Sequence, residues 1–226
     1  MKSRLLYIFG LTLVLCSCGT NKFLSSSVPS SEIRQLDYFE PLAYIQLIEK
    51  GNRPKLSDSL STITRQTLDS ILETKASKLN LNDKISIEND TLKAQIENEL
   101  GNLTQMIFEK NNLEGIVLPP VLDSILESRN QRFAMASIAT GFGRKKGNYG
   151  GQVAKGIGVG ILTLGMYVPT PVKSNMTLYT YIFDSERNEV AFYRRMLTNK
   201  EKEPTDPEFM EQQLISTFNG YFYEKQ

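Results

Sequence analysis

Few residues in this chain have the side chains that catalysis usually needs. The sequence has no histidine, and its only cysteines, Cys16 and Cys18, lie together near the N-terminus. Triads of the Ser-His-Asp or Cys-His kind are therefore excluded, and so is a cysteine-based zinc site in the folded part. Asp58 and Asp69 fall on expected exposed helix faces, and no Ser-x-x-Lys motif stands in a convincing setting. We expect no catalytic residue, no metal and no cofactor.

Cys18 has the most specific chemistry, because the sequence before it has the pattern of an export signal. Residues 1–4 are positively charged, and residues 5–15 form an apolar segment too short to cross a bilayer, which takes roughly 20 residues. The motif Leu-Cys-Ser-Cys that ends at Cys18 resembles a bacterial lipobox. By that resemblance, the bond between Ser17 and Cys18 is cut, and Cys18 receives diacylglycerol. The alternative is an ordinary signal peptide with incidental cysteines.

The residues after Cys18 indicate how the anchor is used. Residues 19–35 are rich in serine and have no periodicity, which is typical of a flexible tether. We divide the chain into a signal peptide over 1–17, a lipid anchor and tether over 18–40, and one domain over 41–226. No acidic cluster follows Cys18, whereas many surface-exposed lipoproteins of Bacteroides-like bacteria carry one. This favours an outer-membrane anchor that faces the periplasm.

The composition is that of an ordinary globular protein near neutrality. The chain has 226 residues, of which 40% are hydrophobic and 23% charged, and its formal net charge is +1. The proposed leader contains Lys2 and Arg4 and no acidic residue, so its removal takes only positive charge away. No global basic field remains to gather nucleic acid. We expect the partners to be membrane lipid, through Cys18, and other envelope proteins.

Hydrophobic periodicity predicts an α/β domain. Apolar residues recur at helical spacing from Leu56 to Ile71, through Ile63 and Thr67, which predicts a helix over 57–77. Further helices are expected from Asp90 or Thr91, over 120–126, and from Pro207 with Asp206 as its cap, and strands over 43–49, 85–87, 116–118, 133–140, 176–183 and 189–195. This order predicts a mixed β-sheet flanked by helices.

A glycine-rich insertion over residues 141–173 interrupts this pattern. It lacks the Gly-Lys-Ser/Thr end of a P-loop, and Ile161 stands where a dinucleotide fingerprint needs its third glycine. Residues 156–172 carry no charge and include the Gly-x-x-x-Gly pair Gly156 and Gly160, which would let helices pack closely in a membrane. The segment is at the lower limit of spanning length, and its glycines and prolines weaken a helix. Membrane insertion, or a place in an oligomeric assembly, is the minority interpretation.

The favoured interpretation of the insertion is a loop followed by a short apolar helix that folds over the sheet. Arg144, Lys145 and Lys146 would then form a solvated basic tip. Such a tip could touch anionic lipid headgroups, at about 1 kcal/mol per charge. With Gly156 and Gly160, these three residues are the candidate membrane contacts besides the lipid on the cysteine.

Two segments near the C-terminus carry a resemblance to known envelope proteins. Leu-Tyr-Thr-Tyr-Ile-Phe-Asp at 178–184 and Val-Ala-Phe-Tyr-Arg-Arg at 190–195 follow the glycine-rich insertion. With the lipid anchor and the element order, they resemble uncharacterised Bacteroides-type lipoproteins. More distantly, the chain is similar to lipoproteins with a TolB N-terminal-like domain, including the curli secretion lipoprotein and activators of cell-wall synthases. The resemblance covers residues 40–226 and implies this α/β fold and a non-enzymatic envelope role.

Three functions follow from these observations. The leading one is a membrane-anchored, non-catalytic adaptor or assembly factor of the bacterial envelope. The first alternative is a subunit of an oligomeric membrane pore or secretion assembly that uses residues 144–172. The second alternative is an unrecognised hydrolase of envelope polymers. The oligomeric state stays open.

Overall fold

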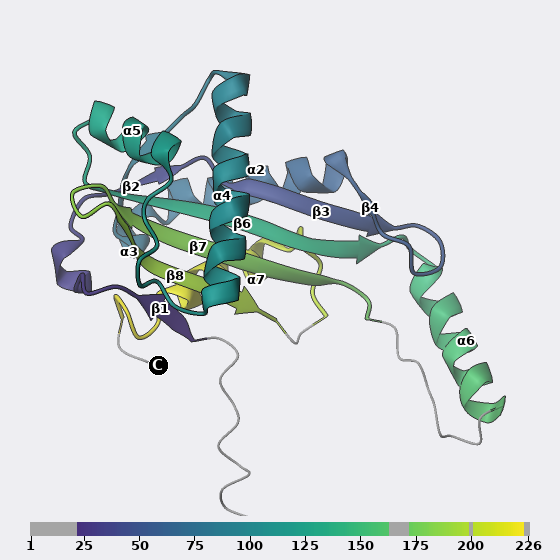
Figure 1. Cartoon of the computed structure of the whole chain (residues 1–226). Helices are drawn as coiled ribbons and strands as arrows, with labels where there is room; N and C mark the ends of the chain where they lie inside the picture. The colour runs from purple at the N-terminus through teal and green to yellow at the C-terminus, as the bar shows by residue number, and fades with distance from the viewer. Residues whose placement is uncertain (1–21, 163–171, 199–200, 224–226) are drawn as a thin grey trace, which may run out of the picture.

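The chain forms one eight-stranded mixed sheet with helices on both faces (Figure 1). The structure is a computed structural model that describes residues 22–162, 172–198 and 201–223. The strands follow the order β1-β8-β7-β6-β2-β5, and β3 and β4 continue beside β6. This confirms the predicted α/β fold with a mixed sheet flanked by helices. The signal peptide and Cys18 lie outside the described residues.

The long strand β6 organises the sheet. The strands are β1 (Phe23–Ser25), β2 (Leu36–Phe39), β3 (Leu42–Ile48), β4 (Lys55–Leu56), β5 (Leu81–Ile85), β6 (Phe133–Arg144), β7 (Asn175–Asp184) and β8 (Glu189–Leu197). β2 and then β3 pair in parallel with the same edge of β6, and Glu40 and Pro41 connect these two strands. On its other edge β6 pairs with β7, and β7 with β8, both antiparallel. The predicted 184–188 hairpin loop is confirmed.

Polar side chains fix the starts of three helices. The helices are α2 (Asp58–Thr74), α3 (Ala76–Leu79), α4 (Asp90–Lys110), α5 (Pro120–Ser128), α6 (Asn148–Leu162) and α7 (Pro207–Thr217), with a short 3-10 turn η2 (Ser30–Glu32). The side chains of Ser57, Asn89 and Asp206 each accept a hydrogen bond from a first-turn backbone N–H. Such a cap stabilises a helix by about 1 kcal/mol. The predicted Asp206 cap is confirmed, while α4 is capped one residue earlier than expected.

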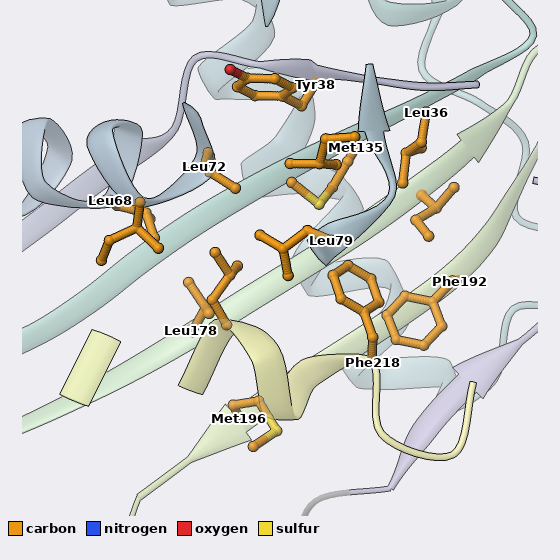
Figure 2. Packing of buried hydrophobic residues seen from close by; sticks show 14 of the residues in the cluster. Leu36, Tyr38, Leu68, Leu72, Leu79, Met135, Leu178, Phe192, Met196 and Phe218 are labelled. Atoms are coloured by element: carbon orange, nitrogen blue, oxygen red, sulfur yellow. The ribbon is translucent and has the colours of Figure 1, made fainter. Parts of the chain in front are cut away.

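A hydrophobic core lies on each face of the sheet. On one face α4 and α5 cover a cluster that includes Leu100, Leu122 and Tyr181. On the other face α2, α3 and α7 cover a second cluster, in which Figure 2 shows Leu72 and Phe218 pointing toward the strands. The domain is thus three layers thick, and burial of these two apolar surfaces is its main source of stability.

The N-terminal segment assigned to the tether belongs to the sheet. β1 pairs antiparallel with β8, and β2 lies between β6 and β5 with every residue buried. Ile33, which lies between β1 and β2 in the sequence, is also buried in the core. The prediction of a flexible tether over 18–40 is therefore wrong for residues 23–39. In the sequence, only residues 19–22 stand between Cys18 and the first strand.

The helix after β4 has a different buried face from the predicted one. The expected helix over 57–77 is α2 followed by the short α3, and α2 buries Thr64, Leu68, Ile71 and Leu72. Ile63, which the prediction placed inside, is 44% exposed. Apolar residues occur on both stripes of this sequence, and packing of α2 against β3 selects the stripe that starts at Thr64.

Two short strands also differ from the prediction. β5 ends at Ile85, where the prediction starts a strand over 85–87. The expected strand over 116–118 is reduced to one bridge between Val117 and Glu189. Pro119 follows at once, and proline has no N–H to continue a ladder.

β6 extends into the region assigned to the glycine-rich insertion. The strand continues through Gly141 to Arg144 and pairs with both β3 and β7. Gly141 has φ +153°, and a Cβ there would lie 2.2 Å from the carbonyl oxygen of Asn175. Only glycine fits this close approach of two strands. The insertion therefore begins after Arg144, not at residue 141.

Candidate functional site

A cleft opens where β2 and β5 end at the same edge of the sheet. The two strands are parallel neighbours, and the chain turns away after Phe39 in β2 and after Ile85 in β5. The cleft has a volume of about 270 Å³, and the first half of α4 forms one wall. Phe39, Leu42 and Ile96 are among its apolar lining residues. Ligands of open α/β sheets commonly bind at the carboxyl ends of strands where the strand order changes, so this cleft is the candidate binding site.

Balanced charges surround the cleft. Glu40 and Arg65 form an ion pair of 2.5 Å between Oε1 and Nη1, with both side chains partly exposed. Lys93 and Glu97 of α4 complete the charged lining. Such a cleft suits a small ligand or one side chain of a protein partner, with an apolar part and polar ends.

A shallower hollow of about 220 Å³ continues from the cleft along β3 and shares Arg65 and Glu97 with it. Ser61 of α2 fixes this edge, because its hydroxyl accepts a hydrogen bond of 2.8 Å from the Ile45 N–H. Burial, together with the neighbouring Glu97 carboxylate, raises the pKa of Tyr44 above its usual value. The Tyr44 hydroxyl thus stays protonated and donates to Glu97, which ties this edge of β3 to α4.

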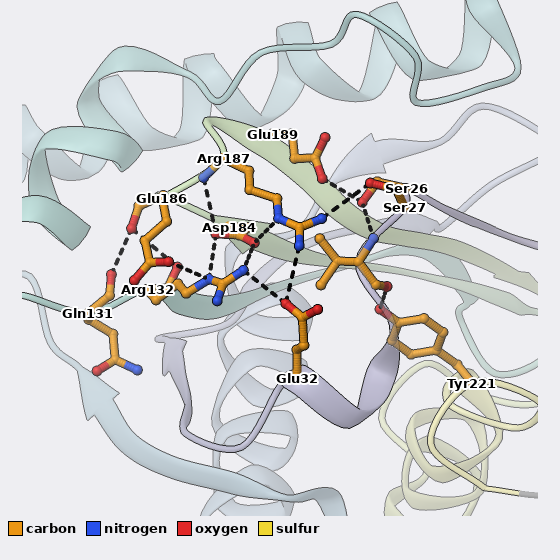
Figure 3. Close-up of polar contacts among 12 residues, drawn as sticks. Ser26, Ser27, Glu32, Gln131, Arg132, Asp184, Glu186, Arg187, Glu189 and Tyr221 are labelled. Carbon is orange, nitrogen blue, oxygen red and sulfur yellow. Dashed lines mark hydrogen bonds and ion pairs between the residues drawn. The ribbon is translucent and has the colours of Figure 1, made fainter.

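A second polar cluster fastens the N-terminal segment to the β7–β8 hairpin (Figure 3). The buried carboxylate of Asp184 accepts hydrogen bonds from Arg132 Nε at 3.0 Å and Nη2 at 2.8 Å. Glu32 accepts from Arg132 and from Arg187, at 3.2 and 3.3 Å. Ser26, just after β1, donates to a carboxylate of the hairpin at 2.7 Å. Residues 23–39 are thus held by strand pairing and by charge.

Arg144 is not a free lipid contact, contrary to the prediction of a solvated basic tip. Its guanidinium donates to the carbonyls of Val172 and Gly51, at 2.7 and 3.0 Å, and to Asn52 Oδ1 at 3.0 Å. It therefore holds three chain segments together. Lys145 and Lys146 are exposed, as expected, and only Lys145 has a carboxylate neighbour, at 4.0 Å, among the described residues.

The glycine-rich helix does not fold over the sheet. Figure 1 shows α6 extending beyond the end of β6, away from both faces. Gly156 and Gly160 belong to this helix, and residues 163–171 lie outside the described residues. The favoured interpretation of a helix lying over the sheet is therefore wrong. Among the described residues, no helix combines the length and apolar character needed to cross a bilayer.

The described residues bring no cluster of three metal-ligating side chains together. The cleft residues Glu40, Arg65 and Glu97 were missed by sequence reasoning, because they come from three elements that only the tertiary fold joins. The break at Pro41 between two apolar segments is the one local signal that could have indicated this edge.

Comparisons with known proteins find only distant likeness. No protein-family model and no curated protein matches the chain. A PelC dodecamer structure from Paraburkholderia phytofirmans aligns over 88% of this chain and 96% of its own, with 6% identity and a TM-score of 0.38. A DUF4136 family protein from Bacteroides thetaiotaomicron aligns over 91% of this chain and 99% of its own, with 5% identity and a TM-score of 0.32. At these values no ligand, assembly or activity is carried over to this chain.

Proposed function

We propose that the chain is a lipid-anchored bacterial envelope protein on the outer membrane, facing the periplasm, whose domain is a non-catalytic adaptor for other envelope proteins. The observation that carries this proposal is the position at which the chain joins the sheet. Phe23 already pairs with β8, directly after the cysteine that resembles a lipidation site. Residues 18–23 span at most roughly 18 Å when fully extended. A lipid on Cys18 would therefore hold the whole domain next to the bilayer.

The cleft supports the adaptor role. Its lining combines apolar side chains with the opposite charges of Glu40, Glu97, Arg65 and Lys93. The Glu40–Arg65 ion pair neutralises two of these charges within the protein. Such a lining favours recognition by shape and hydrogen bonding, as interfaces between proteins do.

The anchor is tested by two cysteine substitutions. Cys18→Ser removes the acceptor thiol, so labelled palmitate should no longer be incorporated. Cys16→Ser is the matched control, because this residue leaves with the signal peptide and its change should leave labelling intact. Labelling that survives Cys18→Ser, or that is lost equally in both variants, would contradict lipidation at Cys18.

The adaptor role is tested by photocrosslinking in intact cells. A photoreactive amino acid in place of Tyr44, in the hollow that continues from the cleft, should give discrete adducts with an envelope protein. The control position is Asn102, which is exposed on α4 and does not line the cleft. Equal adducts at both positions, or none at Tyr44, would count against docking through the cleft.

A second function, a subunit of an oligomeric membrane assembly that uses residues 144–172, is favoured by one observation. α6 extends beyond the sheet (Figure 1), and within the described side chains of this helix, residues 148–155, none belongs to either core cluster. Removal of residues 149–170 should leave the core intact and lower the native mass if this segment joins copies of the chain. An unchanged mass would favour the monomeric adaptor.

A further inference from the structure

Exposed cations gather at the end of the sheet from which α6 starts. The basic end is defined by six exposed residues of three segments: Lys50, Arg53 and Lys55 of the β3–β4 hairpin, Lys145 and Lys146 after β6, and Lys173 before β7. Among the described residues, the one ion pair that these cations form is Lys145 with Glu49, at 4.0 Å. Positive charge that is not paired within a protein is available to an external anion.

Specific contacts hold the three segments in place. The Arg144 guanidinium joins the β3–β4 connection to Val172, as described above. Asn148 at the start of α6 donates to the carbonyls of Ile48 and Gly51, at 3.3 and 3.1 Å. The contacts of Arg144 and Asn148 therefore fix the basic end as one surface, on which cations from distant parts of the sequence lie together. A hollow of about 440 Å³ lies among Lys50, Arg53 and Lys55 and has room for a headgroup.

The strand register directs the N-terminal chain toward this same end. Phe23 pairs with Arg194, and β8 runs from there toward Leu197, which pairs with Thr177 near the start of β7. The chain therefore enters β1 from the side of the basic end. In register, Arg194 is level with Thr180 and Ser137. Arg144 lies seven residues farther along β6 than Ser137, which is roughly 23 Å at the usual rise of a strand.

We propose that the basic end docks on anionic headgroups of the bilayer that carries the lipid anchor. This inference rests on the proposed anchor at Cys18. When the strands point toward the bilayer, residues 18–23 cover at most roughly 18 Å of the roughly 23 Å between the level of Phe23 and that of Arg144. The basic end therefore lies at the headgroups, at the depth of Cys18 or slightly deeper. The anchor supplies attachment, and the cations supply orientation. Each cation near an anionic surface strengthens binding about fivefold at low salt.

The test measures the orientation of the lipidated chain on vesicles. Its acylated form has no free thiol once Cys16 is removed, so one introduced cysteine accepts a fluorophore. Pro54→Cys places the fluorophore at the basic end, and Ser77→Cys places it on α3 as a control. Energy transfer to a headgroup-labelled lipid is compared on phosphatidylcholine vesicles with and without phosphatidylglycerol. We expect energy transfer from position 54, but not from position 77, to increase with phosphatidylglycerol and to fall at high salt.

Charge variants decide whether the basic end causes this effect. K50Q/R53Q/K55Q removes three of the six cations, so it should weaken docking by roughly 100-fold and strongly reduce the response to phosphatidylglycerol. The matched control R34Q/K78Q/R129Q removes three exposed cations near the starts of β2, β5 and β6, at the opposite end of the sheet, and should keep the response.

The outcomes separate this inference from the proposed anchor. A chain that fails to float with phosphatidylcholine vesicles would refute the lipid anchor. A chain that floats, but whose energy transfer is unaffected by phosphatidylglycerol, would refute docking by the basic end and leave the lipid anchor unaffected. Equal losses in the two triple variants would also overturn it, since net charge rather than this surface would then be responsible.

Discussion

Replacement of Arg132 tests how the N-terminal segment is held. Asp184 has a fully buried side chain, while Arg132 is 28% exposed. Arg132→Met leaves the Asp184 carboxylate with Arg187 alone, through its backbone N–H at 3.3 Å and its more distant guanidinium Nε at 3.9 Å. Removing one partner of a buried ion pair usually costs 3–5 kcal/mol, and the partial exposure of Arg132 places our value at about 3 kcal/mol. In a domain of this size, that loss lowers the melting temperature by roughly 6–12 °C.

Urea unfolding of matched variants measures this cost. Arg187→Met removes contacts of a side chain that is 38% exposed, so it should cost less than about 1 kcal/mol. Adding Asp184→Asn to Arg132→Met removes a buried charge that Arg187 compensates only at 3.9 Å and keeps an acceptor for the hairpin, so about 1 kcal/mol of stability should return. The reasoning is refuted if Arg132→Met is no worse than Arg187→Met, or if the double variant is as unstable as Arg132→Met.

Four further substitutions probe the sheet and the cores. Gly141→Ala should cost about 3 kcal/mol in urea unfolding, because its Cβ would meet the Asn175 carbonyl oxygen at 2.2 Å. Tyr181→Phe should cost about 1 kcal/mol, while Thr104→Val should cost about 2 kcal/mol, since it leaves the buried Tyr181 hydroxyl without its partner at 2.5 Å; equal costs would contradict this. Burial raises the pKa of Tyr193 to about 12, so the unfolded chain loses this proton first, and stability should fall as the pH rises from about 10 to about 12. Tyr193→Phe should show a shallower fall between about pH 10 and pH 12, and an unchanged slope would exclude this tyrosine.

Local signals made part of the fold predictable. Asp206 and Pro207 combine a capping acid with a proline in the first turn, and α7 begins there. Residues 184–188 combine turn-forming side chains between two apolar segments, and the β7–β8 hairpin follows. In each case neighbouring residues determine the conformation, so a single sequence is enough.

Tertiary contacts decide the elements that were missed. β2 is buried on both faces, so it lacks the alternation that marks a half-exposed strand. β1 is short and opens a serine-rich segment, and its pairing with β8 alone makes it a strand. The sequence indicated only part of the basic end, because Lys145 and Lys146 are adjacent in the chain. Lys50 and Lys55 join them only in the folded domain, through the contacts of Arg144.

The same register that orients the domain sets the height of the cleft. Ala136 of β6 lines the cleft and lies eight residues before Arg144, or roughly 26 Å along the strand. With the basic end on the headgroups and the strands upright, a partner must therefore meet the cleft within about 26 Å of the bilayer, and any tilt lowers this height. β8 and β7 separate β1 from β6, the strand that lines the cleft, so the proposed lipid anchor does not obstruct the partner. An adaptor built this way would select partners by distance from the membrane as well as by chemistry, which favours the membrane-proximal segments of envelope proteins over freely diffusing ones.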